Sequence, residues 1–555
     1  MHRPPTATLQ TWAGLLALLT QLLATTALGA AVDYRNAGNP PDPRWQMNAE
    51  RRAKALPQTP TLPDRPLRVG DWTAQKRVDI SGNRAVLRER VRLPQVVKEP
   101  GGRAPLVLIL HGNHGACRDR QGIDRCPTPP AQSCAPGETR VYSAEGMNWL
   151  AESLARQGFI AAVVDAEPLV CAYGAQAGFS RVELALAHLQ AWRSAQREGV
   201  AGIDPGVAAA ADLSRVVLIG HSVGGDAALE TAARLKNWPA SSPAPAVIRG
   251  TLLIAPPDWL QSRADSAPLG VVLPSCDGDV YTQAGREIVA RALAAGNLQR
   301  VGLWQMVGGH HNAANTAWPS EADDVGKGLC PRASAIAPEV QRGWLGQLAI
   351  GFVRATASQM PWPAWLYGEA SPPPLRQLDR WPEVRSLVID PGHVRAAEVQ
   401  VSAERVDALT RCAAQPCSPA AGPSEVPGWK VRWSRPGFRL EMRWSGQGPP
   451  SGQRALLRLA ALPGSPRHRP MTLRVSWQVG ARWVPAGTIE VLPPLDHAGS
   501  YGVEIPPIVR MAVELPLPAP WRAVRAVALE GAGEDRGELH VGELIWTPIP
   551  PSRKR

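Results

Sequence analysis

A serine lies between two glycines in the segment GHSVG at residues 220–224. The apolar residues 216–219 before it predict a short buried strand, and the Ala-rich segment after it predicts a helix. On such a strand–turn–helix corner, the hydroxyl of Ser222 stands clear of the sheet edge and can act as a nucleophile. We expect glycine at 220 and 224 because a side chain there would collide with the neighbouring strand or helix. The alternative is an ordinary serine in a glycine-rich turn.

A serine hydroxyl becomes a good nucleophile only when a base removes its proton and an acid orients that base. Two adjacent histidines follow the last strand-like segment of this region, and we favour His311 over His310 as the base. Two surface histidines in a loop are the alternative. The acid is expected at the end of the preceding strand-like segment, where Asp277 is preferred to Asp279 because it lies nearer the strand. Asp165 ends another predicted strand, but a packing or turn role is favoured for it.

The reaction also needs backbone N–H groups that stabilise an oxyanion. One donor is expected from Val223 at the start of the helix. The second is expected from the HGNH loop that follows an apolar strand-like segment, and Asn113 is the favoured residue. We expect His111 and Gly112 to shape that loop. The role of His114 is open between lining the site and packing.

Strand-like and helical patterns alternate five or six times after a predicted hairpin at 71–93. This alternation predicts a mostly parallel sheet covered by helices on both faces. Because parallel strands end at the same edge of an open sheet, the candidate residues should meet there. The expected strands lie within the segments 106–110, 158–165, 216–219, 251–256, 270–280 and 301–312, and the expected helices lie at 145–158, 179–199 and 286–296. In the segments 270–280 and 301–312, the candidate acid and base follow the apolar strand part.

The chain has 555 residues, too many for one hydrophobic core, which indicates several domains. Toward the C-terminus, short alternating segments separated by turn residues predict an antiparallel β-sandwich. We therefore expect an α/β domain followed by an all-β, sandwich-like domain. The expected ranges are 1–30 for a signal peptide, 31–66 for a Pro-rich arm, 67–362 for the α/β domain, 363–435 for a Pro-rich connecting region and 436–550 for the β domain.

Residues 12–28 are apolar and uncharged, and a short basic start precedes them. The run is short for a membrane-spanning helix and lacks a basic stop, so it predicts a signal peptide and a periplasmic or secreted mature chain.

Eight cysteines without a C-x-x-C pair agree with an oxidising compartment. The disulfide pairing is open. Cys412 with Cys417 would close a local loop, and Cys276 with Cys330 would tie the acid and base regions together.

The formal net charge is +12, but the arginines are scattered along the chain. No basic patch interleaved with aromatic residues appears, so nucleic acid is not an expected partner. No metal or cofactor is expected either. His310 and His311 with Asp277 and Asp279 contain ligand types, but adjacent histidines rarely bind one ion together, and a triad fits their strand-end positions better. The GHSVGG segment lacks the Lys-Ser/Thr of a phosphate-binding loop.

The order Ser–Asp–His along the chain, the elbow of Gly220, His221 and Gly224 around Ser222, and the HG loop after a strand resemble the α/β-hydrolase superfamily. The segments GNHGAC, CDGDV and GGHHN are similar to its lipase, esterase and plastic-degrading-hydrolase-like branch. The resemblance covers about residues 70–360. It implies the α/β-hydrolase fold and serine ester hydrolysis without a cofactor. The Cys-rich insert after the HG loop and the C-terminal β domain depart from the simplest members.

The expected function is therefore cleavage of carboxylic esters through an acyl-enzyme, in a small molecule, a lipid or a polymer. An amide hydrolase, a peptidase or an acyltransferase would share every motif. A catalytically silent binding protein would instead act through its β domain. We expect the Cys-rich loop at 116–143 to wall one side of the cleft. The β domain is expected to contact a polymer or surface, or to pack as a structural extension.

Overall fold

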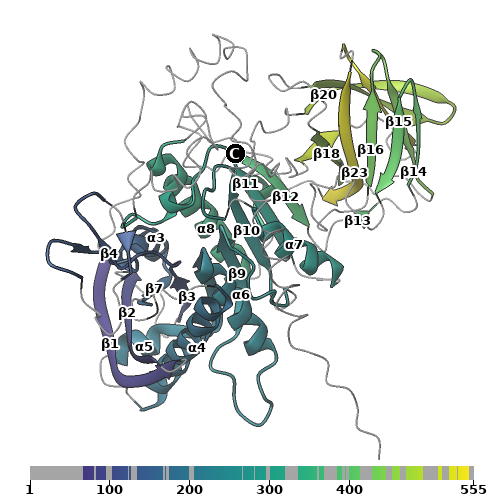
Figure 1. Cartoon of the computed structure of the whole chain (residues 1–555). Coiled ribbons are helices and arrows are strands. Elements are labelled where there is room, and N and C mark those ends of the chain that lie inside the picture. Colours follow the sequence, from purple (N-terminus) through teal and green to yellow (C-terminus); the bar gives the residue numbers. More distant parts are fainter. Residues whose placement is uncertain are drawn as a thin grey trace, which may run out of the picture. The chain divides into compact units, whose positions relative to one another are not determined.

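The computed structural model of the chain describes residues 67–548, apart from short loops and longer segments at 319–335, 368–383, 413–427 and 492–510. The central element is a nine-stranded sheet in the order β1-β2-β7-β3-β8-β9-β10-β11-β12 (Figure 1). The inner strands from β7 to β11 run parallel, whereas β1, β2 and β12 pair antiparallel at the edges. The strands are Leu67–Ile80 (β1), Asn83–Pro94 (β2), Ala104–Leu110 (β3), Ile160–Val164 (β7), Ala211–His221 (β8), Ile248–Ile254 (β9), Leu269–Pro274 (β10), Val301–Met306 (β11) and Val384–Ile389 (β12).

Strand β3 illustrates why helices cover both faces of this sheet. All seven of its residues are buried. Successive side chains of a strand point to opposite faces, so Leu106 and Leu108 enter one core while Val107 and Ile109 enter another. Helices α4 (Gly174–Glu198), α5 (Pro205–Ala210), α6 (Val223–Lys236) and α7 (Gly285–Ala294) contribute to the first core, and α3 (Asn148–Ala155) and α8 (Pro338–Ala357) to the second.

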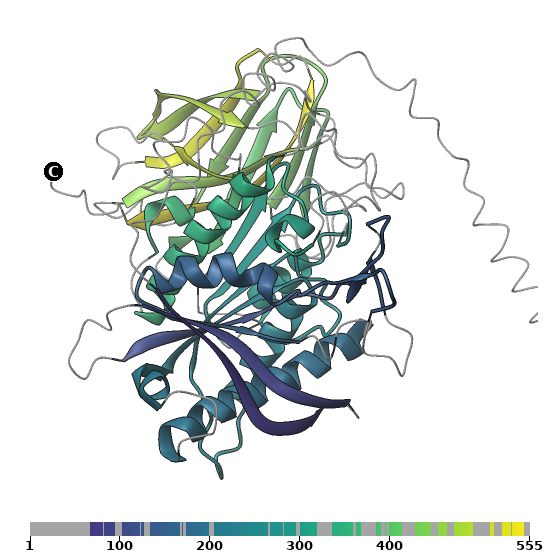
Figure 2. The same cartoon turned by 90° about the vertical axis from the view of Figure 1, so that its left-hand side faces the viewer.

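The elements expected from the sequence form at the expected places in this region. The long, curved hairpin of β1 and β2 is drawn in purple in Figure 2, and Ile80 pairs with Asn83 across its turn. The mostly parallel sheet with helices on both faces is confirmed. Helix α8 had no counterpart among the expected elements.

Separate antiparallel sheets follow the α/β region, as expected for an all-β part of the chain. One has the order β15-β16-β23-β18-β21, with β13 paired to β23, and the other has the order β14-β17-β22-β19-β20. Side chains of both sheets form one hydrophobic core. The strands are Val394–Arg395 (β13), Gln400–Glu404 (β14), Ala408–Cys412 (β15), Gly428–Trp433 (β16), Arg439–Arg443 (β17), Gln453–Ala461 (β18), Met471–Val479 (β19), Arg482–Val491 (β20), Met511–Leu515 (β21), Val524–Gly531 (β22) and Gly537–Pro548 (β23).

Strands also occur where the sequence analysis expects an irregular connecting region, at 363–435. Strand β12 is an edge of the large sheet, and β14, β15 and β16 belong to the antiparallel sheets. The regular structure therefore begins earlier than residue 436. Its short strands are held by cross-strand pairing. The pattern of β14 is weak, because its side chains alternate only between half-buried and exposed, and the strand pairs with β17.

The expected signal peptide and Pro-rich arm, at 1–66, lie outside the described residues. Among the helices that the structure does describe, none has the length and apolar character needed to cross a membrane.

Candidate active site

Ser222 occupies the corner between β8 and α6. Its backbone has φ 54° and ψ −131°, a conformation that costs a residue with a side chain about 1–3 kcal/mol. Two hydrogen bonds hold it. The N–H of Ser222 donates to the carbonyl of Ile254 at 2.8 Å, and the N–H of Gly225 donates to the carbonyl of Ser222 at 2.7 Å. The strained corner is therefore built into the fold.

Close backbone approaches explain the glycines of this corner. A Cβ at Gly220 would lie 2.1 Å from the carbonyl oxygen of Gly224, and a Cβ at Gly224 would lie 2.3 Å from that of Leu110. The collisions expected with the helix and with the neighbouring strand are thus confirmed. A Cβ at Gly112 would lie 2.7 Å from the Cβ of Ser222. The loop after β3 therefore lies against the serine, where an oxyanion donor is needed.

The candidate base and acid meet at the ends of β11 and β10. Nδ1 of His311 lies 3.0 Å from Oδ2 of Asp277, and the two side chains are 0% and 2% exposed. Oδ1 of Asp277 accepts the backbone N–H groups of Asp279 at 3.0 Å and Val280 at 2.6 Å. These bonds fix the carboxylate on the Nδ1 side of the ring, so a neutral His311 carries its proton on Nδ1 and Nε2 is the basic nitrogen.

Asp279 takes a different position from Asp277. Its Oδ2 lies 3.4 Å from Nε2 of His311, and its side chain is 61% exposed. An exposed carboxylate is solvated and is held less firmly than a buried one. Of the two aspartates left open by the sequence, the geometry favours Asp277 as the orienting acid and leaves Asp279 at the solvent side of the base.

Backbone hydrogen bonds join the acid and base loops to each other. The N–H of Ser275 donates to the carbonyl of Met306 at 2.9 Å, and the N–H of Cys276 donates to that of Gly309 at 2.8 Å. The N–H of Gly308 in turn donates to the Ser275 hydroxyl at 2.8 Å. The distance between the acid and the base is therefore set by a small network and not by one side-chain contact.

Helix α8 holds the chain next to the base. Oε1 of Gln341 accepts the backbone N–H of His310 at 2.8 Å, and its Nε2 donates to the carbonyl of His310 at 2.6 Å. Gln341 is fully buried. The structure thus clamps His310 by its backbone, while His311 makes the contact with the acid.

His221 connects the elbow to the base loop. Its Nε2 lies 3.1 Å from the carbonyl oxygen of His311, so this nitrogen donates the hydrogen bond. Burial, and then the charge of nearby His311, lowers the pKa of His221 well below its ordinary value. A neutral His221 therefore serves as a fixed donor that positions the backbone of His311.

The HG loop is shaped by a second buried histidine. Nε2 of His111 accepts the backbone N–H of Ala166 at 3.0 Å, and its Nδ1 donates to the carbonyl of Gly112 at 2.8 Å. Burial, aided by the charge of Arg181, lowers the pKa of His111 to about 3. The ring is thus a neutral spacer, in agreement with the loop-shaping role expected of it.

Arg181 is a site residue that the sequence analysis missed. It lies on α4, is fully buried, and donates to the carbonyl of Gly112 and to Oδ1 of Asn113, both at 3.2 Å. A third bond, at 3.1 Å, reaches the carbonyl of Ala177. Arg181 therefore orients the side chain of the expected oxyanion residue. One signal in the sequence could have identified Arg181. It lies on the same face of the helix as the apolar residue Ala185, four positions later, which is also buried, so a charged side chain stands in the apolar stripe of an amphipathic helix.

Trp318 is the second residue that was missed. Its indole lies 4.7 Å from the ring of His114, 5.0 Å from His221 and 6.4 Å from His311, measured between ring centroids. Its Nε1 donates to the hydroxyl of Ser143 at 2.9 Å. His114, whose role the sequence leaves open, stacks on this indole. Nothing local in the sequence marks Trp318, because its contacts come from four separate segments.

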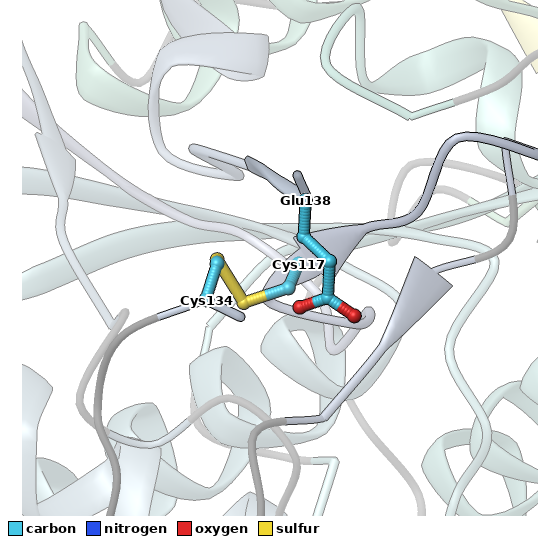
Figure 3. Close-up of side chains that lie close together, drawn as sticks. All are labelled: Cys117, Cys134 and Glu138. Carbon is cyan, nitrogen blue, oxygen red and sulfur yellow. A yellow bond between two sulfur atoms is a disulfide. The ribbon is translucent and has the colours of Figure 1, made fainter. Parts of the chain in front are cut away.

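Figure 3 shows three side chains of the insert that are close enough to suggest a metal site. They are Cys117, Cys134 and Glu138. The two sulfur atoms are joined in a disulfide, however, so neither is a free thiolate ligand. Oε2 of Glu138 accepts the backbone N–H of Ala135 at 2.9 Å. These three residues therefore form a turn that is held by a disulfide and a hydrogen bond, and not a set of free metal ligands.

A disulfide-bonded cysteine also lies beside the candidate acid. Cys126 and Cys276 are disulfide-bonded, and the described part of the chain contains no free cysteine. Cys330, one possible partner of Cys276, lies outside the described residues, as does Cys417, the possible partner of Cys412. Cys276 directly precedes the acid, so its bond anchors the acid loop.

Asp226, on the first turn of α6, gives the fold a testable pH dependence. Burial raises its pKa to about 7, although the backbone N–H of Trp259 donates to Oδ2 at 2.7 Å. The folded protein keeps this proton up to about pH 7, whereas the unfolded chain loses it near pH 4. The free energy of unfolding should therefore fall as the pH rises from about 4 to 7. Asp226→Asn should remove that fall and be more stable at pH 8 by on the order of 2–4 kcal/mol. Melting temperatures of both proteins from pH 4 to 8 test this; parallel curves would contradict it.

No protein-family model matches the chain, and no curated protein has significant similarity to it.

Proposed function

We propose that the protein is a serine hydrolase of the α/β-hydrolase fold that cleaves carboxylic esters. The observation that carries this proposal is the left-handed backbone of Ser222 on the β8–α6 corner, together with the contact of His311 and Asp277 at the ends of neighbouring strands. A strained serine at a strand–helix corner, a buried His–Asp pair and a glycine loop against the serine are the parts that acyl transfer needs.

The first half of the reaction forms an acyl-enzyme. Oγ of Ser222 attacks the ester carbonyl carbon while Nε2 of His311 takes the hydroxyl proton. The negative charge moves to the carbonyl oxygen, where the backbone N–H groups of Val223 and Asn113 stabilise it. Asp277 stabilises the imidazolium that results. The C–O bond to the alcohol then breaks, and the alcohol leaves with the proton from Nε2.

The second half reverses these roles with water. His311 removes a proton from a water molecule, which attacks the acyl carbon. The same N–H groups stabilise the second oxyanion. Collapse breaks the bond to Ser222, whose oxygen recovers the proton, and releases the carboxylic acid. No cofactor enters this balance.

We also propose a cell compartment and a substrate class for this reaction. We infer that the apolar segment 12–28 exports the chain to the periplasm or the medium, where the Cys117–Cys134 disulfide would persist. The substrate would be an ester in a small molecule, a lipid or a polymer. The antiparallel sheets after residue 400 would contact a polymer or surface, or serve as a structural extension.

Turnover of p-nitrophenyl esters from acetate to palmitate tests this function on the mature protein. We expect hydrolysis well above the buffer rate for at least one chain length, with little release from the matching p-nitroanilides. Faster release from the anilides would favour an amide hydrolase or peptidase. Absence of ester turnover would contradict the proposal and favour acyl transfer to another acceptor or a binding role.

A further inference from the structure

A pocket of about 410 Å³ lies between the disulfide-closed insert and the segment that follows His311. Arg118, Arg140 and Tyr142 line it from the insert, and Thr316 lines it from the other side. Tyr142 is 52% exposed, so a large aromatic side chain faces solvent at this pocket. The hydrolytic steps above use none of these side chains.

The pocket lies beside the nucleophile, with one indole ring between them. Its wall at Thr316 leads directly to Trp318. At one end of that indole, Cη2 lies 2.8 Å from the Cβ position at Gly112, a point that is 2.7 Å from the Cβ of Ser222. At the other end, Nε1 donates to Ser143, next to Tyr142 of the pocket. The Trp318 indole therefore separates the serine from the pocket, and an acyl chain that starts at Ser222 must pass the edge of this ring to reach the two arginines.

The backbone of both arginines and the guanidinium of Arg118 are held in place before any ligand arrives. Strand β4 (Cys117–Arg118) pairs with β6 (Thr139–Arg140) in a small ribbon, in which Cys117 lies opposite Arg140. The disulfide to Cys134 staples this ribbon (Figure 3). Nη2 of Arg118 also donates to the carbonyl of Ala317 at 3.0 Å. Such preorganisation reduces the entropy lost on binding.

The charge of the lining indicates what the pocket takes. Among the described residues of the lining, Arg118 and Arg140 carry two positive charges and Glu145 carries the one negative charge, so one positive charge is in excess. A guanidinium fork matches a carboxylate in shape and in charge. We propose that this pocket binds a carboxylate on the substrate, so that the preferred substrates are esters that carry a second, ionised carboxyl group. This assignment rests on the proposed hydrolase function.

Paired substrates separate the two proposals. The p-nitrophenyl monoesters of succinate, glutarate and adipate carry a terminal carboxylate, and those of butyrate, valerate and hexanoate are their neutral counterparts. We expect kcat/KM to be higher for the anionic member of at least one pair. Arg140→Gln should lower the anionic-to-neutral ratio about tenfold, and Arg118→Gln should lower it too. Arg125→Gln is the control, because Arg125 lies in the same insert but pairs with Asp119 outside the pocket lining.

The outcomes are distinguishable. A wild-type ratio at or below one, or a ratio that neither arginine substitution lowers, would overturn the carboxylate pocket while ester turnover remained. If no ester is turned over, calorimetric binding of glutarate to the wild type and to Arg140→Gln decides the matter. Weaker binding by the variant supports the pocket, and equal binding overturns it.

Discussion

Replacing Ser222 by Ala should lower kcat/KM for the best p-nitrophenyl ester by at least about 10⁴-fold, because the nucleophile and the covalent intermediate are both lost. The fold should survive the change. Alanine needs the same unusual φ of 54° as serine, and the two hydrogen bonds that hold the corner are made by the backbone. The free energy of unfolding should therefore change little. Steady-state kinetics and thermal melting on the same samples measure both effects.

Ser153→Ala is a matched control for that substitution. The Ser153 hydroxyl donates to the carbonyl of Trp149 on helix α3 and takes no part in the proposed site. Its loss should leave kcat/KM within about twofold of the wild type, since a surface or half-buried substitution away from the site has small effects. Ester turnover by the Ser222 variant within tenfold of the wild type would rule out Ser222 as the nucleophile.

Asp277→Asn should lower kcat by about 10³- to 10⁴-fold, the loss seen when the orienting acid of a serine triad is neutralised. The amide keeps the shape of the carboxylate but cannot stabilise the imidazolium of His311. Asp277 is also nearly fully buried, so water does not replace the lost charge. Rate profiles against pH and substrate concentration measure the change.

Asp279→Asn is the matched comparison, because the same chemical change is made on the other carboxylate near the ring. We expect less than tenfold loss, since the Asp279 side chain is 61% exposed and its charge is screened. A larger loss for Asp279 than for Asp277 would reverse the assignment of the acid.

The sequence was sufficient for those parts of the site that depend on local chain geometry. A glycine on each side of Ser222 predicts close backbone approaches. In the structure, a Cβ added at Gly220 or Gly224 would lie only 2.1 Å or 2.3 Å from a backbone oxygen. Because parallel strands end at one edge of a sheet, the sequence also predicted that His311 and Asp277 lie close together. The sequence could not decide between Asp277 and Asp279 as the acid, because that choice depends on which side chain is buried.

The parts that were missed depend on contacts between distant segments. Arg181 reaches the HG loop across 68 residues of sequence, and Trp318 reaches Ser143 across 175. The strands between 384 and 433 were also missed, because proline-rich surroundings hide short strands whose stability comes from partners elsewhere in the chain. The pocket beside Trp318 likewise exists only once the insert folds back on the segment after His311.

Covalent labelling of the mature protein with a fluorophosphonate, followed by peptide mapping, shows whether the Ser222 hydroxyl is an activated nucleophile. The reagent phosphonylates a serine only when a base activates its hydroxyl. We predict one adduct per chain, located on Ser222, with none in the Ser222→Ala protein. A chain that stays unlabelled while folded, or an adduct on another serine, would contradict the account of this site.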